Sequence, residues 1–147
     1  MVPTLFGRIQ TRLFLLATVG LAVTLLITPV LPGTSGAPLG DRYTTTLIVL
    51  AAVGVVGIGW ELVYHLLMQF RWEKDWPSLF GLLNLINEGV LLFVLVKAGL
   101  LPGLPAEPSA AAFWTHFTVV WLAVWLVSNG PMRVPFVRWR FRGGRLV

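Results

Sequence analysis

Residues 44–70 of the chain are TTTLIVLAAVGVVGIGWELVYHLLMQF, an apolar stretch interrupted by Glu61 and His65. A helix that crosses ~30 Å of hydrocarbon needs ~20 residues of this kind. In hydrocarbon each backbone N–H and C=O must be paired within its own segment, which favours helices over the shorter, alternating strands of a barrel. Three further apolar stretches of similar length lie at about residues 13–31, 78–101 and 110–128. The sequence therefore predicts an all-α membrane protein, a four-transmembrane-helix bundle with short loops.

The composition agrees with a chain that has lipid as its solvent. Hydrophobic residues make up 56% of its 147 residues and charged residues only 12%, whereas a soluble domain carries about 25% charged residues. Cysteine is absent, which excludes disulfides, thiolate metal ligands and thiol chemistry. We expect a single integral membrane domain, residues 1–147, in a bacterial inner membrane, with a basic tail over residues 131–147.

The cations are distributed unevenly between the two ends of the predicted spans. Lys and Arg concentrate in the cytoplasmic loops of membrane proteins. Arg42 and Lys97 fall on one side of the predicted bundle. The remaining cations all fall on the other side: Arg8, Arg12, Arg71, Lys74, Arg133, Arg138, Arg140, Arg142 and Arg145. We therefore expect the N-terminus, the middle loop and the C-terminal tail to face the cytoplasm.

Polar residues inside predicted spans are candidate functional groups, since burying them in hydrocarbon is costly. Glu61 and His65 are four residues apart on the second span, as are Asn84 and Glu88 on the third, so each pair shares a helix face. If these antiparallel faces meet, two carboxyls, an imidazole and one or two amides, counting Asn87, form one cluster. Such a cluster can share protons or pass a cation. We favour the simpler hypothesis that it provides interhelical hydrogen bonds, worth about 0.6–2 kcal/mol each.

Signals for cofactors and catalysis are weak. Glu61 and His65 have the spacing of two metal ligands on one helical face, but a third anchoring ligand is not evident. His65 and His116 are expected near opposite ends of their spans, about 20 Å apart along the membrane normal, too far for a bis-histidine haem. Nucleophilic catalysis has no candidate motif. We expect no cofactor, no metal and no enzymatic activity, and an intramembrane metalloenzyme is the weakest alternative.

Small residues recur every three positions on the second span, at Ala51, Gly54 and Gly57. Small side chains let a second helix approach closely. This pattern predicts close packing along one face, either inside the bundle or against another chain.

Two aromatic features indicate contact surfaces. Trp121 and Trp125 form a stripe on the fourth span, and Trp121 lies near the expected midplane, where an interfacial aromatic belt does not explain it. A flat aromatic surface there suits a partner helix, a bound lipid or a pigment-like ligand, although core or lipid-facing packing is simpler. In the tail, cations alternate with aromatic rings, in the order Arg138, Trp139, Arg140, Phe141 and Arg142.

An extended tail would place its arginines on one side and its rings on the other. That arrangement suits the anionic headgroups of the lipid bilayer. Docking onto a cytoplasmic partner is the alternative, and we do not expect nucleic-acid binding.

Two functions from different classes follow. The first is a non-catalytic accessory or structural subunit of a larger membrane assembly. The second is a proton- or cation-coupled carrier or channel, acting as a homo-oligomer through Glu61 and Glu88. The substitution Glu88→Gln distinguishes them on sequence grounds. A titrating carboxyl would lose transport, whereas a residue that only hydrogen-bonds would tolerate Gln and not Leu.

Overall fold

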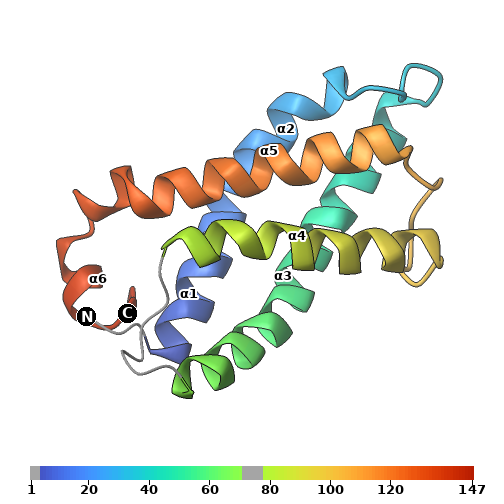
Figure 1. Cartoon of the computed structure of the whole chain (residues 1–147). Coiled ribbons are helices and arrows are strands. Elements are labelled where there is room, and N and C mark those ends of the chain that lie inside the picture. Colours follow the sequence, from blue (N-terminus) through green and yellow to red (C-terminus); the bar gives the residue numbers. More distant parts are fainter. Residues whose placement is uncertain (1–3, 71–77) are drawn as a thin grey trace.

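A computed structural model describes residues 4–70 and 78–147 and is helical throughout its regular elements (Figure 1). The first long helix is α1 (Leu5–Leu15), which continues through a π-helical segment (Leu16–Gly20) into α2 (Leu21–Ile27) and a 3₁₀ turn (Thr28–Val30). The other elements are α3 (Leu39–Gln69), α4 (Ser78–Lys97), α5 (Ala110–Asn129), a 3₁₀ turn (Pro131–Arg133) and α6 (Val137–Phe141). The predicted middle loop lies outside the described residues.

Three helices in the described part of the chain are long and apolar enough to cross a membrane. They extend over Leu5–Val30, Leu39–Gln69 and Ala110–Arg133. The chain therefore has the character of an integral membrane protein. The fourth predicted span corresponds to α4, which has 20 residues, and its passage through the bilayer stays a prediction.

Helices α4 and α5 begin at the predicted residues, whereas α3 begins five residues earlier and the first helix about eight residues earlier than predicted. The first helix starts at Leu5, whereas the sequence placed its start near Leu13. Thr4 caps this helix, because its hydroxyl accepts a hydrogen bond from the backbone N–H of Gly7 at 3.2 Å. The earlier start carries Arg8 and Arg12 into the helix and onto the bundle.

The helices form a ring in which each long element has two neighbours. The first helix packs against α3 and α5, and α4 packs against α3 and α5. The start of α1 and the C-terminal segment lie at one end of the bundle, which we call the terminal end (Figure 1). The connections that follow α2 and α4 lie at the opposite end, the loop end, where the Ser109 hydroxyl donates to the Pro32 carbonyl at 3.4 Å.

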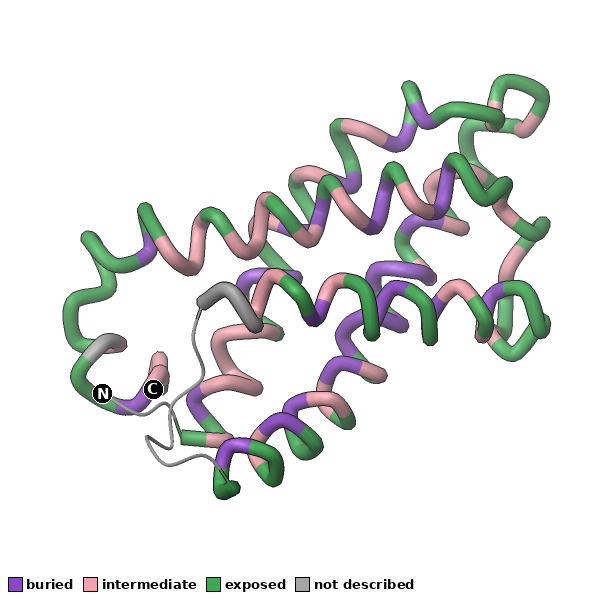
Figure 2. Tube along the Cα trace, viewed as in Figure 1, coloured by how far each residue is buried: buried purple, intermediate pink, exposed green. Residues whose placement is uncertain are grey.

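The core of the bundle is apolar and lies between the long helices. Its buried residues come mainly from α3, α4 and α5 and include Val49, Val53, Leu92, Val96 and Phe117. Large apolar side chains also cover the outer faces, which are the exposed stretches in Figure 2. A helix that is apolar all round suits a membrane span, since its outward side chains meet lipid.

Candidate functional site

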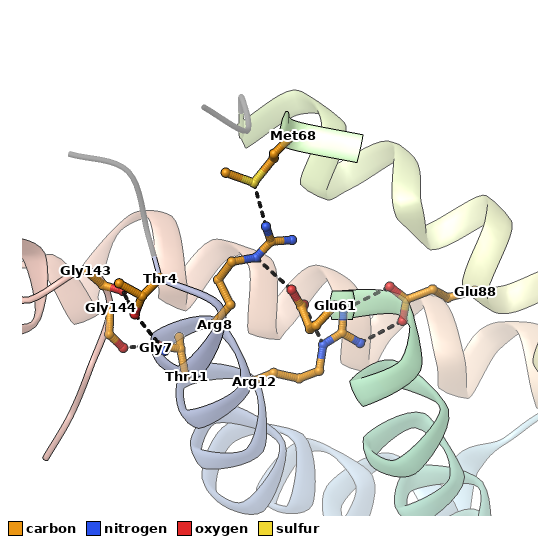
Figure 3. Close-up of polar contacts among 10 residues, drawn as sticks. All are labelled: Thr4, Gly7, Arg8, Thr11, Arg12, Glu61, Met68, Glu88, Gly143 and Gly144. Carbon is orange, nitrogen blue, oxygen red and sulfur yellow. Dashed lines mark hydrogen bonds and ion pairs between the residues drawn. The ribbon is translucent and has the colours of Figure 1, made fainter. Parts of the chain in front are cut away.

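The charged residues of the first helix point into the bundle. Arg8 and Arg12 are one turn apart and therefore share a face, and this face packs on α3. Figure 3 shows both side chains reaching from α1 toward the carboxylate of Glu61 on α3. The sequence had assigned these arginines to the cytoplasmic edge, where they would only set the orientation.

Arg12 joins two carboxylates from two different helices. Its Nη1 and Nη2 donate to Glu88 Oε2 and Oε1 at 2.7 and 2.9 Å, and its Nε donates to Glu61 Oε1 at 3.0 Å. The planar guanidinium matches a carboxylate with two parallel hydrogen bonds, the strong form of this pair. Arg12 therefore connects α1, α3 and α4 through one side chain.

Arg8 completes the arrangement from the neighbouring turn. Its Nε donates to Glu61 Oε2 at 2.7 Å, and its Nη1 lies 2.7 Å from the Met68 sulfur (Figure 3). Glu61 thus accepts from two arginines, and Arg12 donates to two glutamates. We call Arg8, Glu61, Arg12 and Glu88 the Arg–Glu network. Its formal charges balance, which limits the cost of holding ions away from water.

The network is nearly closed to its surroundings. The side chains of Arg8 and Arg12 are 11% and 13% exposed, and those of Glu61 and Glu88 are 9% and 1% exposed. In such a site an ion pair is weakly stabilising overall, but removal of one partner leaves a buried charge without compensation. The network therefore holds α1, α3 and α4 in register, and substitution of any one of its four residues should destabilise the fold.

Two neighbours shape the space that Arg12 occupies. A Cβ atom on Gly57 would lie 2.3 Å from Arg12 Nη1, so only glycine leaves room for the guanidinium at that point of α3. On the other side, the Arg12 Cζ lies 5.5 Å from the centre of the Trp121 ring, within the range of a cation–π interaction. The small residues predicted to admit a helix thus also admit a charged side chain.

The residues predicted to form one polar cluster are placed as follows. Glu61 and Glu88 both belong to the network and are connected through Arg12. Asn84 is buried, His65 is half-buried and Asn87 is exposed. Among the described residues, no hydrogen bond joins these three to the network, and His65 Nδ1 is buried without a partner.

Sequence reasoning missed the two arginines as members of the site. A signal was available, because Arg8 and Arg12 have the i,i+4 spacing of one helix face and directly precede an apolar stretch. Two buried acids on neighbouring spans can also be compensated by two cations from a third helix. Counting cations on the two sides of the predicted bundle considers neither the shared helix face nor the buried acids.

The C-terminal segment packs on the first helix, and its conformation differs from the extended tail considered above. Residues Val137–Phe141 form helix α6. Trp139 Nε1 donates to the Thr11 hydroxyl at 2.7 Å, and that hydroxyl donates to the Gly144 carbonyl at 2.9 Å. The Gly143 carbonyl accepts from the Thr4 N–H at 2.8 Å (Figure 3).

This conformation separates the aromatic and basic residues differently from an extended strand. Trp139 faces the first helix, whereas Phe141, Arg138 and Arg142 are exposed. The side chain of Arg140 lies outside the described part of the structure. A Cβ on Gly7 would lie 2.1 Å from the Gly143 carbonyl oxygen, so the close approach of the tail requires glycine there.

A second group of buried polar residues lies toward the loop end and contains no formal charge when its histidine is neutral. The His116 Nε2 is 2.9 Å from the Thr24 hydroxyl, and the hydroxyls of Thr28 and Thr46 are 2.8 Å apart. The Thr28 hydroxyl also donates to the Thr24 carbonyl at 2.6 Å. We call these four residues the Thr–His cluster.

Two cavities approach each other at His116. The terminal cavity, about 280 Å³, is lined by Arg8, Arg12 and Glu61 and by the inner face of α5 from Asn129 to His116. Trp121 and Trp125 are half-buried and form part of this wall, and their predicted role as a partner or lipid surface stays a prediction. The loop cavity, about 320 Å³, is lined by residues that include Asp41, Arg42, Thr46, Glu107 and His116.

The described side chains offer no evident metal site, since no group of three His, Asp or Glu residues in that part of the chain could hold an ion. Comparison of the chain with known protein families, curated proteins and solved structures finds no match. The interpretation of the site therefore rests on its geometry.

Proposed function

We propose that this chain is a four-span membrane protein of the bacterial inner membrane, with both ends in the cytoplasm, that serves as a non-catalytic subunit of a larger membrane assembly. The observation that carries the proposal is the balanced Arg–Glu network. Its carboxylates are already bound by arginine side chains from the same chain. They therefore serve as fixed links between helices, which is what a structural subunit requires.

The placement of charge supports the proposed orientation. Arg133, Arg138 and Arg142 follow α5 at the terminal end, where α1 also begins (Figure 1). The positive-inside rule assigns such an end to the cytoplasm. The start of α1 lies beside the C-terminal segment, which agrees with an even number of crossings and thus with α4 as a fourth span.

The outer face of α3 offers a place to test for a neighbouring subunit. Val55 is 71% exposed on this helix, whereas Val53 is buried at 4%. A photo-cross-linking residue in place of Val55 should capture the same protein that native mass spectrometry of the intact complex finds at fixed stoichiometry. The same residue in place of Val53 should capture none. A chain that is purified only as a monomer or homo-oligomer would contradict the proposal.

A carrier of protons is the second candidate, favoured by the position of His116. This residue lines both the terminal cavity and the loop cavity, so a proton could pass from one cavity to the other through its imidazole. A carrier also requires the Arg12 pairs to open during its cycle. Proton flux into liposomes containing the protein should be lost in His116→Leu and retained in Thr115→Leu, an exposed neighbour on α5. Absence of flux in the unaltered protein would reject this candidate.

A further inference from the structure

The terminal cavity is long, narrow and amphipathic. It follows the inner face of α5 from Asn129 to His116, about 20 Å of helix at ~1.5 Å per residue. Its middle is walled by apolar and aromatic side chains that recur every three or four residues: Phe117, Val120, Trp121, Val124 and Trp125. Leu15 and Val53 cover the opposite side. A chain of methylene groups fits such a space better than a compact polar molecule does.

The end of this cavity nearest the chain termini is positively charged. Arg8, Arg12 and Arg133 line it, and Glu61 is the carboxylate among its lining residues. Glu61 and Glu88 balance the charges of Arg8 and Arg12. Arg133 adds a further positive charge, and its side chain bonds to a neutral amide. An anion at this end would therefore gain favourable electrostatic interaction.

The hydrogen bonds of these two arginines point to the same conclusion. Arg8 directs Nη1 at a thioether sulfur, a weak acceptor. Arg133 donates from Nη2 to the neutral amide oxygen of Asn129 at 3.2 Å. A guanidinium forms its stronger bonds with carboxylate or phosphate oxygens. Both side chains therefore carry donors that a bound anion would engage better than their present partners do.

We propose that the terminal cavity binds a single-chain amphiphile with an anionic head. The head, a carboxylate or a phosphate monoester, lies between Arg8 and Arg133. The acyl chain extends past Trp125 and Trp121 toward Phe117. The cavity volume of about 280 Å³ lies just below the range of about 300–1,000 Å³ for ligand sites, which favours one acyl chain over the two chains of a phospholipid. Arg12 acts as a positioning residue, because its donors already hold Glu61 and Glu88.

The test measures quenching of tryptophan fluorescence in the full-length protein in a neutral detergent. Three brominated amphiphiles share one chain and differ in the head: carboxylate, phosphate monoester or trimethylammonium. Saturable quenching is expected with an anionic head, and only linear partitioning with the ammonium head. Stronger binding of the carboxylate identifies a fatty acid, and stronger binding of the phosphate identifies a lysolipid-like ligand. Equal quenching by all three heads would overturn the proposal.

Two matched pairs of variants locate the site. Arg133→Gln should weaken binding of the anionic amphiphile about tenfold, the usual order for loss of a charge-assisted hydrogen bond. Arg138→Gln, an exposed residue that does not line the cavity, should bind unchanged. Val124→Phe narrows the cavity and should abolish saturable quenching, whereas Val119→Phe on the outer face of α5 should retain it. If Val124→Phe fails to fold, the comparison of Arg133→Gln with Arg138→Gln tests the site. Equal affinity of these two variants for the anionic amphiphile would reject it.

Discussion

The two halves of the bundle bury polar groups in different ways. Toward the terminal end, the Arg–Glu network holds four ionised side chains from α1, α3 and α4. Toward the loop end, the Thr–His cluster holds hydroxyls and an imidazole. A hydroxyl can donate a hydrogen bond to a backbone carbonyl of its own helix, as the Thr28 hydroxyl does to the Thr24 carbonyl. Buried ions need a partner of opposite charge, so each residue of the Arg–Glu network depends on another helix.

This difference predicts unequal consequences of substitution. Removal of a hydroxyl leaves a neutral partner, which in a membrane loses only a modest hydrogen bond. Removal of one carboxylate leaves a guanidinium charged and buried, because arginine does not deprotonate in proteins. The terminal half should therefore be the sensitive half of the molecule.

The largest effect is expected for Glu88→Gln. Glutamine cannot balance the charge of Arg12, so the free energy of unfolding should fall by about 3–5 kcal/mol, the usual result of breaking a buried ion pair. The measurement is denaturation by sodium dodecyl sulfate in mild detergent micelles, followed by tryptophan fluorescence. The sequence alone led us to expect that a purely structural Glu88 would tolerate Gln, and the partnership with Arg12 reverses that expectation.

A double variant tests whether charge imbalance is the cause. Arg12→Gln combined with Glu88→Gln removes one cation and one anion, and leaves the pair of Arg8 and Glu61 intact. It should recover most of the stability that Glu88→Gln loses. If the double variant is no more stable than Glu88→Gln, lost hydrogen bonds and not an unpaired charge explain the effect.

A smaller loss is expected when the space for Arg12 is filled. The Cβ of Gly57→Ala would lie 2.3 Å from Arg12 Nη1. The ion pairs hold that group in place, so overpacking should cost about 1–3 kcal/mol. Gly59→Ala on the same helix is the matched control, because its Cβ would have nothing within 4 Å. The same denaturation experiment compares them, and equal stability of the two variants would contradict a role for Gly57 in admitting Arg12.

The smallest effect is expected in the loop half. Thr24→Val keeps the shape of the side chain and removes its hydrogen bond with His116, which should cost about 0.6–2 kcal/mol. Thr44→Val is the control, since the Thr44 hydroxyl is exposed and bonds only to its own helix at Gly40. A loss in Thr24→Val as large as that in Glu88→Gln would remove the distinction between the two halves.

The sequence predicted the helices well and the site in part, for a physical reason. Long apolar stretches determine where helices form, so residues 110–128 closely matched α5. Residues 44–70 matched the end of α3, which begins five residues earlier, at Leu39. The start of the first helix was misplaced because Arg8 and Arg12 are favourable at a membrane edge as well as in a bundle. Only the position of Glu61 and Glu88 in space distinguishes these cases, and one sequence contains no distances.

The tail illustrates a second limit. Alternation of cations and rings from residue 138 to 142 is compatible with an extended segment, but α6 is helical there. The conformation follows from contacts more than a hundred residues away, such as that between Trp139 and Thr11. Local patterns do not contain such contacts. The contact between the Trp121 ring and the Arg12 guanidinium could not be predicted either, because it depends on the position of Arg12 inside the bundle.

The connections of Arg12 also set an order of events during synthesis. Its partners follow it by 49 and 76 residues, so the first helix leaves the ribosome before either counterion exists. Arg8 and Arg12 must wait at the membrane surface or in contact with the insertion machinery until α3 and α4 arrive. Gly143, whose carbonyl accepts from the Thr4 hydroxyl, follows Thr4 by 139 residues. The first helix can therefore take its final place only after segments far downstream in the chain have been made.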